Sequence, residues 1–181
     1  METKQLIANL AARNIHAQFL PGLSEAKAEI LSMLPDNVSV GIGNSQTIKA
    51  MNLTDTLLQK GYTVYDKTLA SSREESKSLK KQALLAQWYI SGSNAIALDG
   101  RIVNIDHSGN RAAALTFGPD YVIIVVGVKR LPKVSRQPWS GPGFRRRLKT
   151  HAGQALTRPA QKQIFASMSA SPPGVQQSIG Y

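Results

Sequence analysis

The residues best suited to chemistry lie in two polar loops, one at residues 91–94 (SGSN) and one at residues 104–111 (NIDHSGNR). Two short apolar-rich runs, residues 95–98 and 101–104, lie between the loops, and a hairpin joining these runs would let both loops line a single cleft. The loops carry hydroxyl and amide groups together with a carboxylate and a guanidinium. Such a set can bind a small anionic molecule, and its carboxylate can act as an acid or a base.

Each of these side chains also has a purely structural interpretation. Asp106 is the candidate catalytic residue, but its carboxylate could instead cap the turn that follows. Arg111 could bind a carboxylate or a phosphate, or it could form a surface salt bridge. The polar side chains of residues 91–94 could donate hydrogen bonds to a ligand or satisfy their own turn. Asp106 and His107 are adjacent in sequence, so their side chains would diverge and we do not expect a catalytic dyad.

A glycine-rich turn at residues 41–45 (GIGNS) is a further candidate. It follows a β-branched run at residues 38–41 and precedes a helical pattern that continues to Leu57. A strand, a turn and a helix in this order place backbone N–H groups where they can hold an anion. The turn is not a full GxGxxG motif, and a tight turn that needs glycine for steric reasons is an equal alternative.

The apolar periodicity around these loops predicts alternating helices and strands. We expect helices at residues 1–19, 24–34 with Ser24 as N-cap, 47–57, 71–86 with Ser71 or Ser72 as N-cap, and 110–115. We expect strands at residues 38–41, 61–66 and 121–127, and a hairpin whose Asp99-Gly100 dipeptide favours a two-residue type I′ turn. The predicted fold class is α/β, with an open, largely parallel sheet and flanking helices. Ligands of such sheets bind beyond the carboxyl ends of the strands, where the turn at residues 41–45 and the loop at residues 91–94 would fall.

The charge of the chain is concentrated in its last third. Of the net charge of +11, residues 1–128 contribute +1, from 12 basic and 11 acidic residues, whereas residues 129–181 hold 10 basic residues and no acidic one. We therefore expect a nearly neutral domain at 1–128 followed by a basic tail. The chain has no cysteine and no long apolar run, so we expect a cytoplasmic protein without disulfides and without membrane association. Three scattered histidines make a metal site an unfavoured interpretation.

Three segments, VGIGNSQTIKAM, ALLAQWYISGSNAIALDGRIVNIDHSGNRAAAL and YVIIVVGV, resemble the LUD domain (lactate utilisation protein) family over about residues 1–128. The resemblance implies a fold similar to that of CoA transferases and sugar-phosphate isomerases. It also implies a role in oxidation of lactate or a related hydroxy acid, alongside an iron–sulfur partner protein. One departure is Gln87, where the family pattern leads us to expect an acidic residue. The matching motif residues are Gly41, Gly43, Ser45, Thr47, Ser91, Ser93, Asn94, Asp99, Gly100, Asn104, Asp106, Gly109, Asn110 and Arg111.

The tail at residues 129–181 departs from the resemblance, which implies an amphipathic helix and a Cys-rich segment after the last strand. Read from the third base of each codon, residues 132–144 permit ESLEAAVERARL and residues 157–166 permit PPCAKTDIC. We hypothesise that the tail is translated in a shifted reading frame. It would then be largely disordered, and its arginine cluster would not be a nucleic-acid site.

Three classes of function remain, in decreasing order of preference. The first is a subunit or accessory protein of lactate oxidation that binds an anionic metabolite, with no cofactor identified. The second is a stand-alone enzyme similar to a sugar-phosphate isomerase, or a CoA-dependent enzyme; a transferase would need a carboxylate nucleophile, and no glutamate follows Glu75. The third is nucleic-acid binding through the basic tail. With Asp106 as the candidate catalytic residue, the candidate ligand-binding residues are Gly41, Gly43, Asn44, Ser45, Ser91, Ser93, Asn94, Asn104, Asn110 and Arg111.

Overall fold

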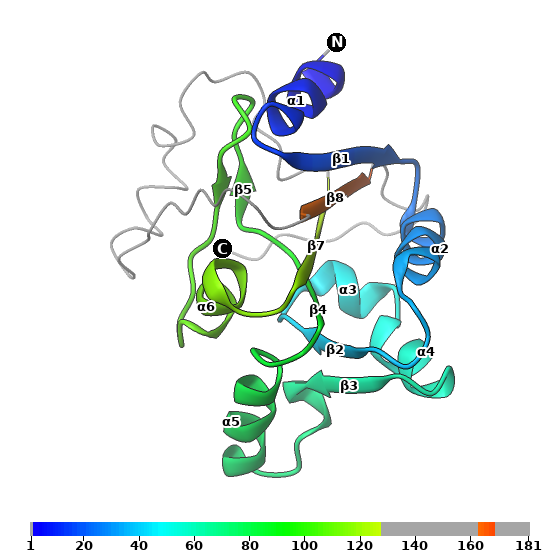
Figure 1. The fold of residues 1–181 in the computed structure, drawn as a ribbon, viewed down its shortest axis with the longest axis vertical. Coiled ribbons are helices and arrows are strands. Elements are labelled where there is room, and N and C mark those ends of the chain that lie inside the picture. The colour runs from blue at the N-terminus through cyan, green and yellow to red at the C-terminus, as the bar shows by residue number, and fades with distance from the viewer. Residues whose placement is uncertain (1, 128–162, 169–181) are drawn as a thin grey trace, which may run out of the picture.

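A computed structural model describes residues 2–127 and 163–168, and its centre is a six-stranded sheet (Figure 1). The strand order is β1-β8-β7-β4-β2-β3, and every neighbouring pair in the sheet is parallel. The predicted α/β class with a largely parallel sheet is therefore confirmed. The strands are β1 (Ile15–Leu20), β2 (Ser39–Ile42), β3 (Thr63–Asp66), β4 (Trp88–Ser91), β7 (Tyr121–Gly127) and β8 (Gln163–Met168).

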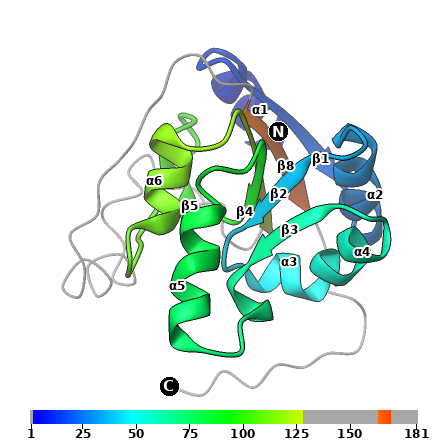
Figure 2. The same ribbon diagram turned by 60° about the horizontal axis from the view of Figure 1, so that its bottom comes forward.

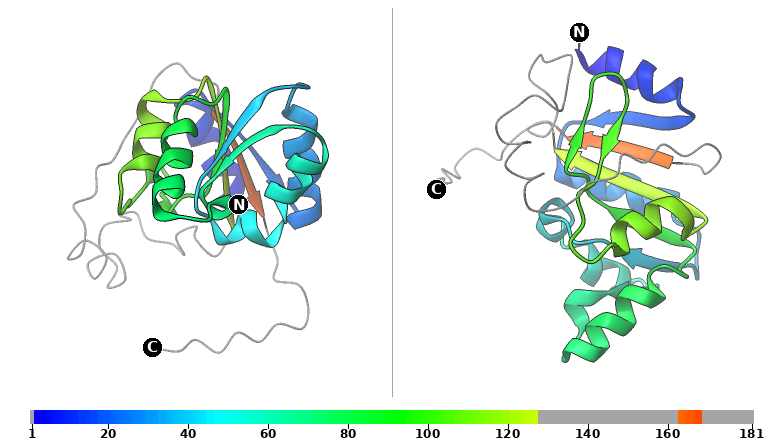
Figure 3. Two further views of the ribbon diagram at one scale, coloured as in Figure 1. Left: turned by 90° about the horizontal axis from the view of Figure 1, so that it is seen from below. Right: turned by 90° about the vertical axis from the view of Figure 1, so that its left-hand side faces the viewer.

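Helices cover both faces of the sheet, as Figures 2 and 3 show. One face packs against α2 (Leu23–Met33), α3 (Gln46–Ala50) and α4 (Leu53–Gln59). The other face packs against α1 (Glu2–Ala11), α6 (Asn110–Phe117), the residues just after α5 (Arg73–Gln82) and the hairpin of β5 (Ala95–Ile96) and β6 (Ile102–Val103). Strands β4 and β7 lie between the two layers, and the apolar run at residues 122–126 is buried on both sides as predicted.

The predicted helix over residues 1–19 is wrong in its second half. Helix α1 ends at Ala11, Asn14 adopts a left-handed conformation with φ 58°, and the chain continues as strand β1. The apolar residues Ile15 and Phe19 are four apart, a spacing that fits a helix. However, Ala17 between them also fits the two-residue period of a strand, and pairing with β8 decides for the strand.

Two further helix boundaries differ from expectation for local reasons. Residues 46–59 form two short helices rather than one, because Asn52 takes φ 48° and redirects the chain between them. Ser24 lies inside α2, whose N-cap is the extended Gly22. Helix α5 begins as predicted, since the Ser72 hydroxyl accepts a hydrogen bond from the Glu75 N–H at 3.0 Å.

The hairpin is present, but its turn is not the predicted two-residue type I′ turn. The Gly100 N–H donates to the Ala97 carbonyl at 2.9 Å, and the Ala97 N–H donates to the Arg101 carbonyl at 2.8 Å. Gly100 has φ 84°, whereas Asp99 does not have a positive φ. A type I turn closed by a glycine in the left-handed region makes a three-residue loop, and Asp99 need not leave the favoured region.

Part of the predicted tail forms a strand. Residues 163–168 (QIFASM) make β8, which is inserted between β1 and β7 and pairs with both. For these six residues the structure differs from the expected disordered tail, because the backbones of β1 and β7 both need a partner along these edges. The predicted helix segment of the shifted frame, residues 132–144, lies outside the described residues. The predicted cysteine segment, residues 157–166, overlaps β8 at residues 163–166 and otherwise lies outside them.

Candidate functional site

The turn after β2 and the end of β4 are in close contact at the carboxyl edge of the sheet. The Gly43 N–H donates to the Ile90 carbonyl at 2.8 Å, which extends the strand pairing by one residue. A Cβ atom at Gly43 would overlap the Ser91 side chain and lie 2.9 Å from the Tyr89 hydroxyl. Glycine is therefore required here because two side chains of β4 occupy the space that a methyl group would fill.

The glycine-rich turn at residues 41–45 and the loop at residues 91–94 meet at Ser45 and Gly92. A Cβ atom at Gly92 would lie 2.7 Å from the Ser45 hydroxyl oxygen, so the loop after β4 passes directly beside the turn after β2. Ser45 is the N-cap residue of α3, but its side chain makes no capping hydrogen bond, and Asn44 beside it is exposed. Helix α3 has only five residues, so backbone N–H groups rather than a helix dipole would attract an anion here.

A bridge between Asn94 and Arg111 joins the loop after β4 to helix α6. Nη2 of Arg111 donates to Oδ1 of Asn94 at 2.6 Å and to the Ile105 carbonyl at 2.8 Å, and the same Oδ1 accepts from the Ile105 N–H at 2.9 Å. Both side chains are partly buried. The structure thus brings these two predicted site residues into direct contact, with an amide holding the guanidinium in place.

Asp106 holds the start of helix α6. Its Oδ2 accepts hydrogen bonds from the backbone N–H groups of Arg111 at 2.6 Å and Ala112 at 3.1 Å. These groups lie in the first turn of α6, where N–H groups lack partners within the helix and a negative charge is favourable. The geometry is that of the capping interpretation, with both bonds made by one carboxylate oxygen.

The remaining predicted residues lie in the same region but mostly face the protein itself. The Ser93 hydroxyl, which is buried, donates to the Val103 carbonyl at 2.8 Å, and Oδ1 of Asn110 accepts from the Ser108 hydroxyl at 3.0 Å. Gly41 lies within β2, where a Cβ atom would meet the Ala83 carbonyl oxygen at 2.7 Å. Oδ1 of Asn104 is different, because it is buried and has no hydrogen-bond partner among the described residues.

Sequence reasoning missed Tyr89, the residue that connects the two halves of the site. Tyr89 is 1% exposed, and its phenol oxygen has no hydrogen-bond partner within the described part of the chain. Burial raises the pKa of the phenol far above its usual value, Arg111 lowers it, and Asp106 raises it further. A tyrosine inside the apolar run WYI should have been a signal, because a buried hydroxyl in such a run needs a partner.

Asp66 is a second buried polar residue that the sequence did not single out. It ends strand β3 beside β2 and is 5% exposed. Oδ2 accepts from the Thr54 hydroxyl at 2.7 Å, and Oδ1 accepts from the Thr68 N–H at 2.9 Å. Because both oxygens have hydrogen-bond partners, the local structure explains why this carboxylate is buried.

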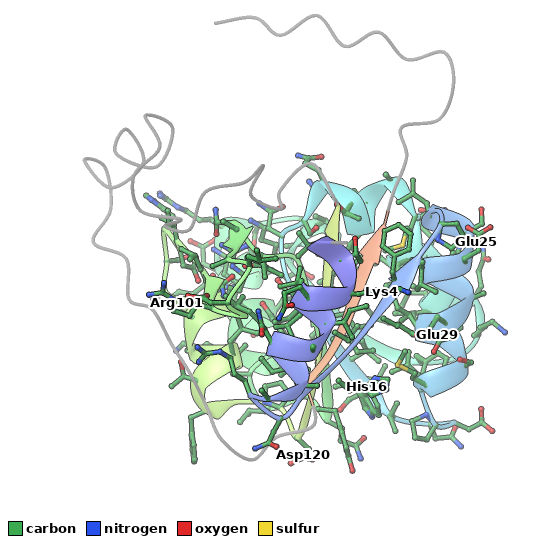
Figure 4. The ribbon with its side chains drawn as sticks, turned by 90° about the horizontal axis from the view of Figure 1, so that it is seen from above. Lys4, His16, Glu25, Glu29, Arg101 and Asp120 are labelled. Carbon is green, nitrogen blue, oxygen red and sulfur yellow. The ribbon has the colours of Figure 1, made fainter. Side chains whose placement is uncertain are left out.

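Other polar residues lie away from this edge. At the hairpin tip, Asp99 pairs with Arg101 at 2.6 Å, and Figure 4 shows Arg101 on the opposite side of the molecule from Glu25 and Glu29. Gln87 lies where β4 begins, and it exchanges hydrogen bonds of 3.1 and 3.0 Å with Ser39. Its departure from the family pattern therefore does not touch the candidate site. No group of three or more potential metal ligands occurs among residues 2–127 and 163–168.

These features define an open, parallel α/β protein with a polar site at the carboxyl ends of its central strands. Its family is given by a family model, described as LUD domain, that matches residues 3–137. The chain belongs to the LUD domain family, whose members are generally associated with lactate utilisation.

Solved structures support the fold. A DUF162 family protein from Deinococcus radiodurans is similar with a TM-score of 0.55 and 13% sequence identity, over 92% of this chain and 95% of that one. Ribose 5-phosphate isomerase A from Methanocaldococcus jannaschii has a TM-score of 0.41 and 15% identity, over 61% of this chain and 54% of that one, which is too low to support an argument. No curated protein matches the chain. Within the described residues, no helix has the length and apolar character needed to span a membrane.

Proposed function

We propose that this protein binds a small hydroxycarboxylate such as lactate, as a subunit or accessory protein of a pathway that oxidises it. The observation that carries the proposal is the Arg111 guanidinium, held by Asn94 of the loop after β4, and that loop passes beside the turn after β2. Nη2 bonds to two neutral oxygens, the amide oxygen of Asn94 and the Ile105 carbonyl, which orient the guanidinium. A fixed, partly buried guanidinium is well suited to a carboxylate, which it can bind through parallel hydrogen bonds.

The redox part of the proposal rests on family membership and on composition. LUD domain proteins are associated with lactate utilisation, which is an oxidation. The 181 residues contain no cysteine, and cysteine thiolates are the usual ligands of iron–sulfur clusters. We therefore expect any cluster that takes electrons from the hydroxy acid to be carried by a partner protein, with this chain supplying the binding site for the acid.

The enzymatic alternatives have less support from the geometry. An isomerase would need Asp99 or Asp106 as a base. The first is paired with Arg101 at the hairpin tip, and the second accepts two backbone hydrogen bonds at the start of α6. The nucleic-acid alternative rests on the basic tail, most of which lies outside the described residues.

Calorimetric titration of the full chain with lactate tests the proposal. We expect saturable binding in the wild type and a loss of about tenfold or more in affinity for Arg111→Ala, since hydrogen bonds to charged groups contribute about 1.5–3 kcal/mol. Arg101→Ala is the matched control, because it removes an equal charge from the hairpin tip and should change the affinity less than about twofold. Absence of saturable binding in the wild type, or equal affinities of all three proteins, would refute the proposal.

A further inference from the structure

The Tyr89 hydroxyl is buried, and the residues around it do not explain why a polar group lies there. Its oxygen is inaccessible to solvent and has no hydrogen-bond partner among the described residues. The Ser91 hydroxyl is close enough to the phenol for a hydrogen-bonding effect that lowers the phenol pKa. However, Ser91 donates its proton to the Gly92 carbonyl at 3.2 Å, and its geometry toward the phenol oxygen is not that of a hydrogen bond. A buried hydroxyl without a partner destabilises a protein by about 1–3 kcal/mol, so its presence requires an explanation.

The position of this hydroxyl is that of a ligand-binding group. It faces the Cα atom of Gly43, at the turn that leaves the carboxyl end of β2, where a methyl group would come within 2.9 Å of it. Arg111 and Asp106 are both close enough to shift the pKa of the phenol. The hydroxyl therefore lies beside the glycine turn and within electrostatic reach of the Arg111 guanidinium.

The phenol of Tyr89 stays protonated at neutral pH. Burial raises its pKa, and the effect of Arg111 is too small to reverse that rise, so the hydroxyl keeps its proton. It is therefore a neutral group that can donate and accept a hydrogen bond, and not a base. Of the two polar groups of a hydroxycarboxylate, the carboxylate suits the charged guanidinium, and the uncharged hydroxyl suits a neutral, buried partner.

We propose that the Tyr89 hydroxyl is the group that recognises the 2-hydroxyl of the ligand, while Arg111 binds the carboxylate. This inference rests on the proposed function and adds the feature that selects a 2-hydroxy acid over a simple carboxylic acid. Binding would give the phenol the hydrogen-bond partner that it lacks in the free protein.

The first test compares the stability of the ligand-free variants. Tyr89→Phe removes only the hydroxyl, so we expect its melting temperature to rise by roughly 2–12 °C because an unsatisfied buried group is lost. Tyr62→Phe is the matched control, because the Tyr62 hydroxyl is partly buried, donates to the Leu34 carbonyl at 3.3 Å and packs in the core on the opposite face of the sheet. Its melting temperature should fall slightly. A fall for Tyr89→Phe would mean that the phenol is already satisfied and would overturn the inference.

The second test measures selectivity by titrating each full-length protein with D-lactate, L-lactate and propionate, which carry the same charge and differ in the 2-hydroxyl. The wild type and Tyr62→Phe should prefer at least one lactate enantiomer over propionate by about tenfold. In Tyr89→Phe the preference should fall to less than about twofold, with propionate affinity unchanged. If the wild type binds lactate through Arg111 but Tyr89→Phe keeps the preference, this inference alone fails. If the wild type binds none of the three acids, the proposed function fails and the inference fails with it.

Discussion

Replacement of Asp106 by alanine separates the capping role of this residue from a catalytic one. The substitution removes a carboxylate oxygen that accepts two backbone hydrogen bonds, of 2.6 and 3.1 Å, in the first turn of α6. Loss of a capping side chain costs about 1 kcal/mol. Loss of the favourable negative charge beside the helix start adds about 0.3–1 kcal/mol, and the partly buried site places the value near the upper end. The expected loss of unfolding free energy is therefore about 2 kcal/mol.

Urea unfolding followed by circular dichroism measures this loss directly, as a lower midpoint with an unchanged slope. Asp106→Asn should lose about half as much, because the amide oxygen still accepts a hydrogen bond but carries no charge. Asp120→Ala is a suitable control, since Asp120 is an exposed acid just after the same helix and its removal changes the net charge equally. A loss of less than about 0.5 kcal/mol for Asp106→Ala would show that the cap does not stabilise α6 and would reopen a chemical role for the carboxylate.

Three further predictions concern neighbouring parts of the structure. Asn94→Ala should lower the unfolding free energy by about 1–3 kcal/mol in urea titrations, because two partly buried donors lose their shared acceptor; a neutral result would contradict the bridge. Gly43→Ala should cost about 1–3 kcal/mol, since the methyl group overlaps the Ser91 side chain, and wild-type stability in this variant would show that the turn can move. Hydrogen bonds from Ser71 lower the pKa of the exposed Glu75 below 4.5, so its contribution is present above pH 4.5 and is lost as the pH falls through the lower folded value. The urea midpoints of wild type and Glu75→Gln should therefore differ at pH 6 and converge toward pH 3, and a constant difference would contradict this linkage.

The elements around the site could be predicted wherever one local signal was decisive. The run at residues 121–127 is apolar throughout and can only be a buried strand of this length, and the serines before α5 have few uses other than capping. Where the apolar residues fit both the period of a helix and that of a strand, strand pairing in the folded sheet decided the structure. Ile15 and Phe19 suit either a helix or a strand, and only the backbone of β8 makes the strand the better solution.

The sequence predicted where the site lies in the fold, but not what each of its side chains contacts. Loops at 41–45 and 91–94 do meet at the carboxyl ends of adjacent strands, since this follows from parallel pairing. Which side chains face each other does not follow from spacing. Asp106 accepts hydrogen bonds from the first turn of α6, and the Ser93 hydroxyl donates to the backbone of the hairpin. Tyr89 was overlooked because a tyrosine in an apolar run resembles an ordinary core residue.

The place of β8 in the sheet has a consequence for the order in which the protein folds. Strand β1 pairs with β8 alone among the described strands, although β8 is encoded about 150 residues later. At a synthesis rate of about 5–20 residues per second, the first strand leaves the ribosome roughly 7–30 seconds before its neighbour exists. Until then its backbone is an open edge, which can pair with other chains. Binding by a ribosome-associated chaperone during this interval would protect the nascent protein from aggregation.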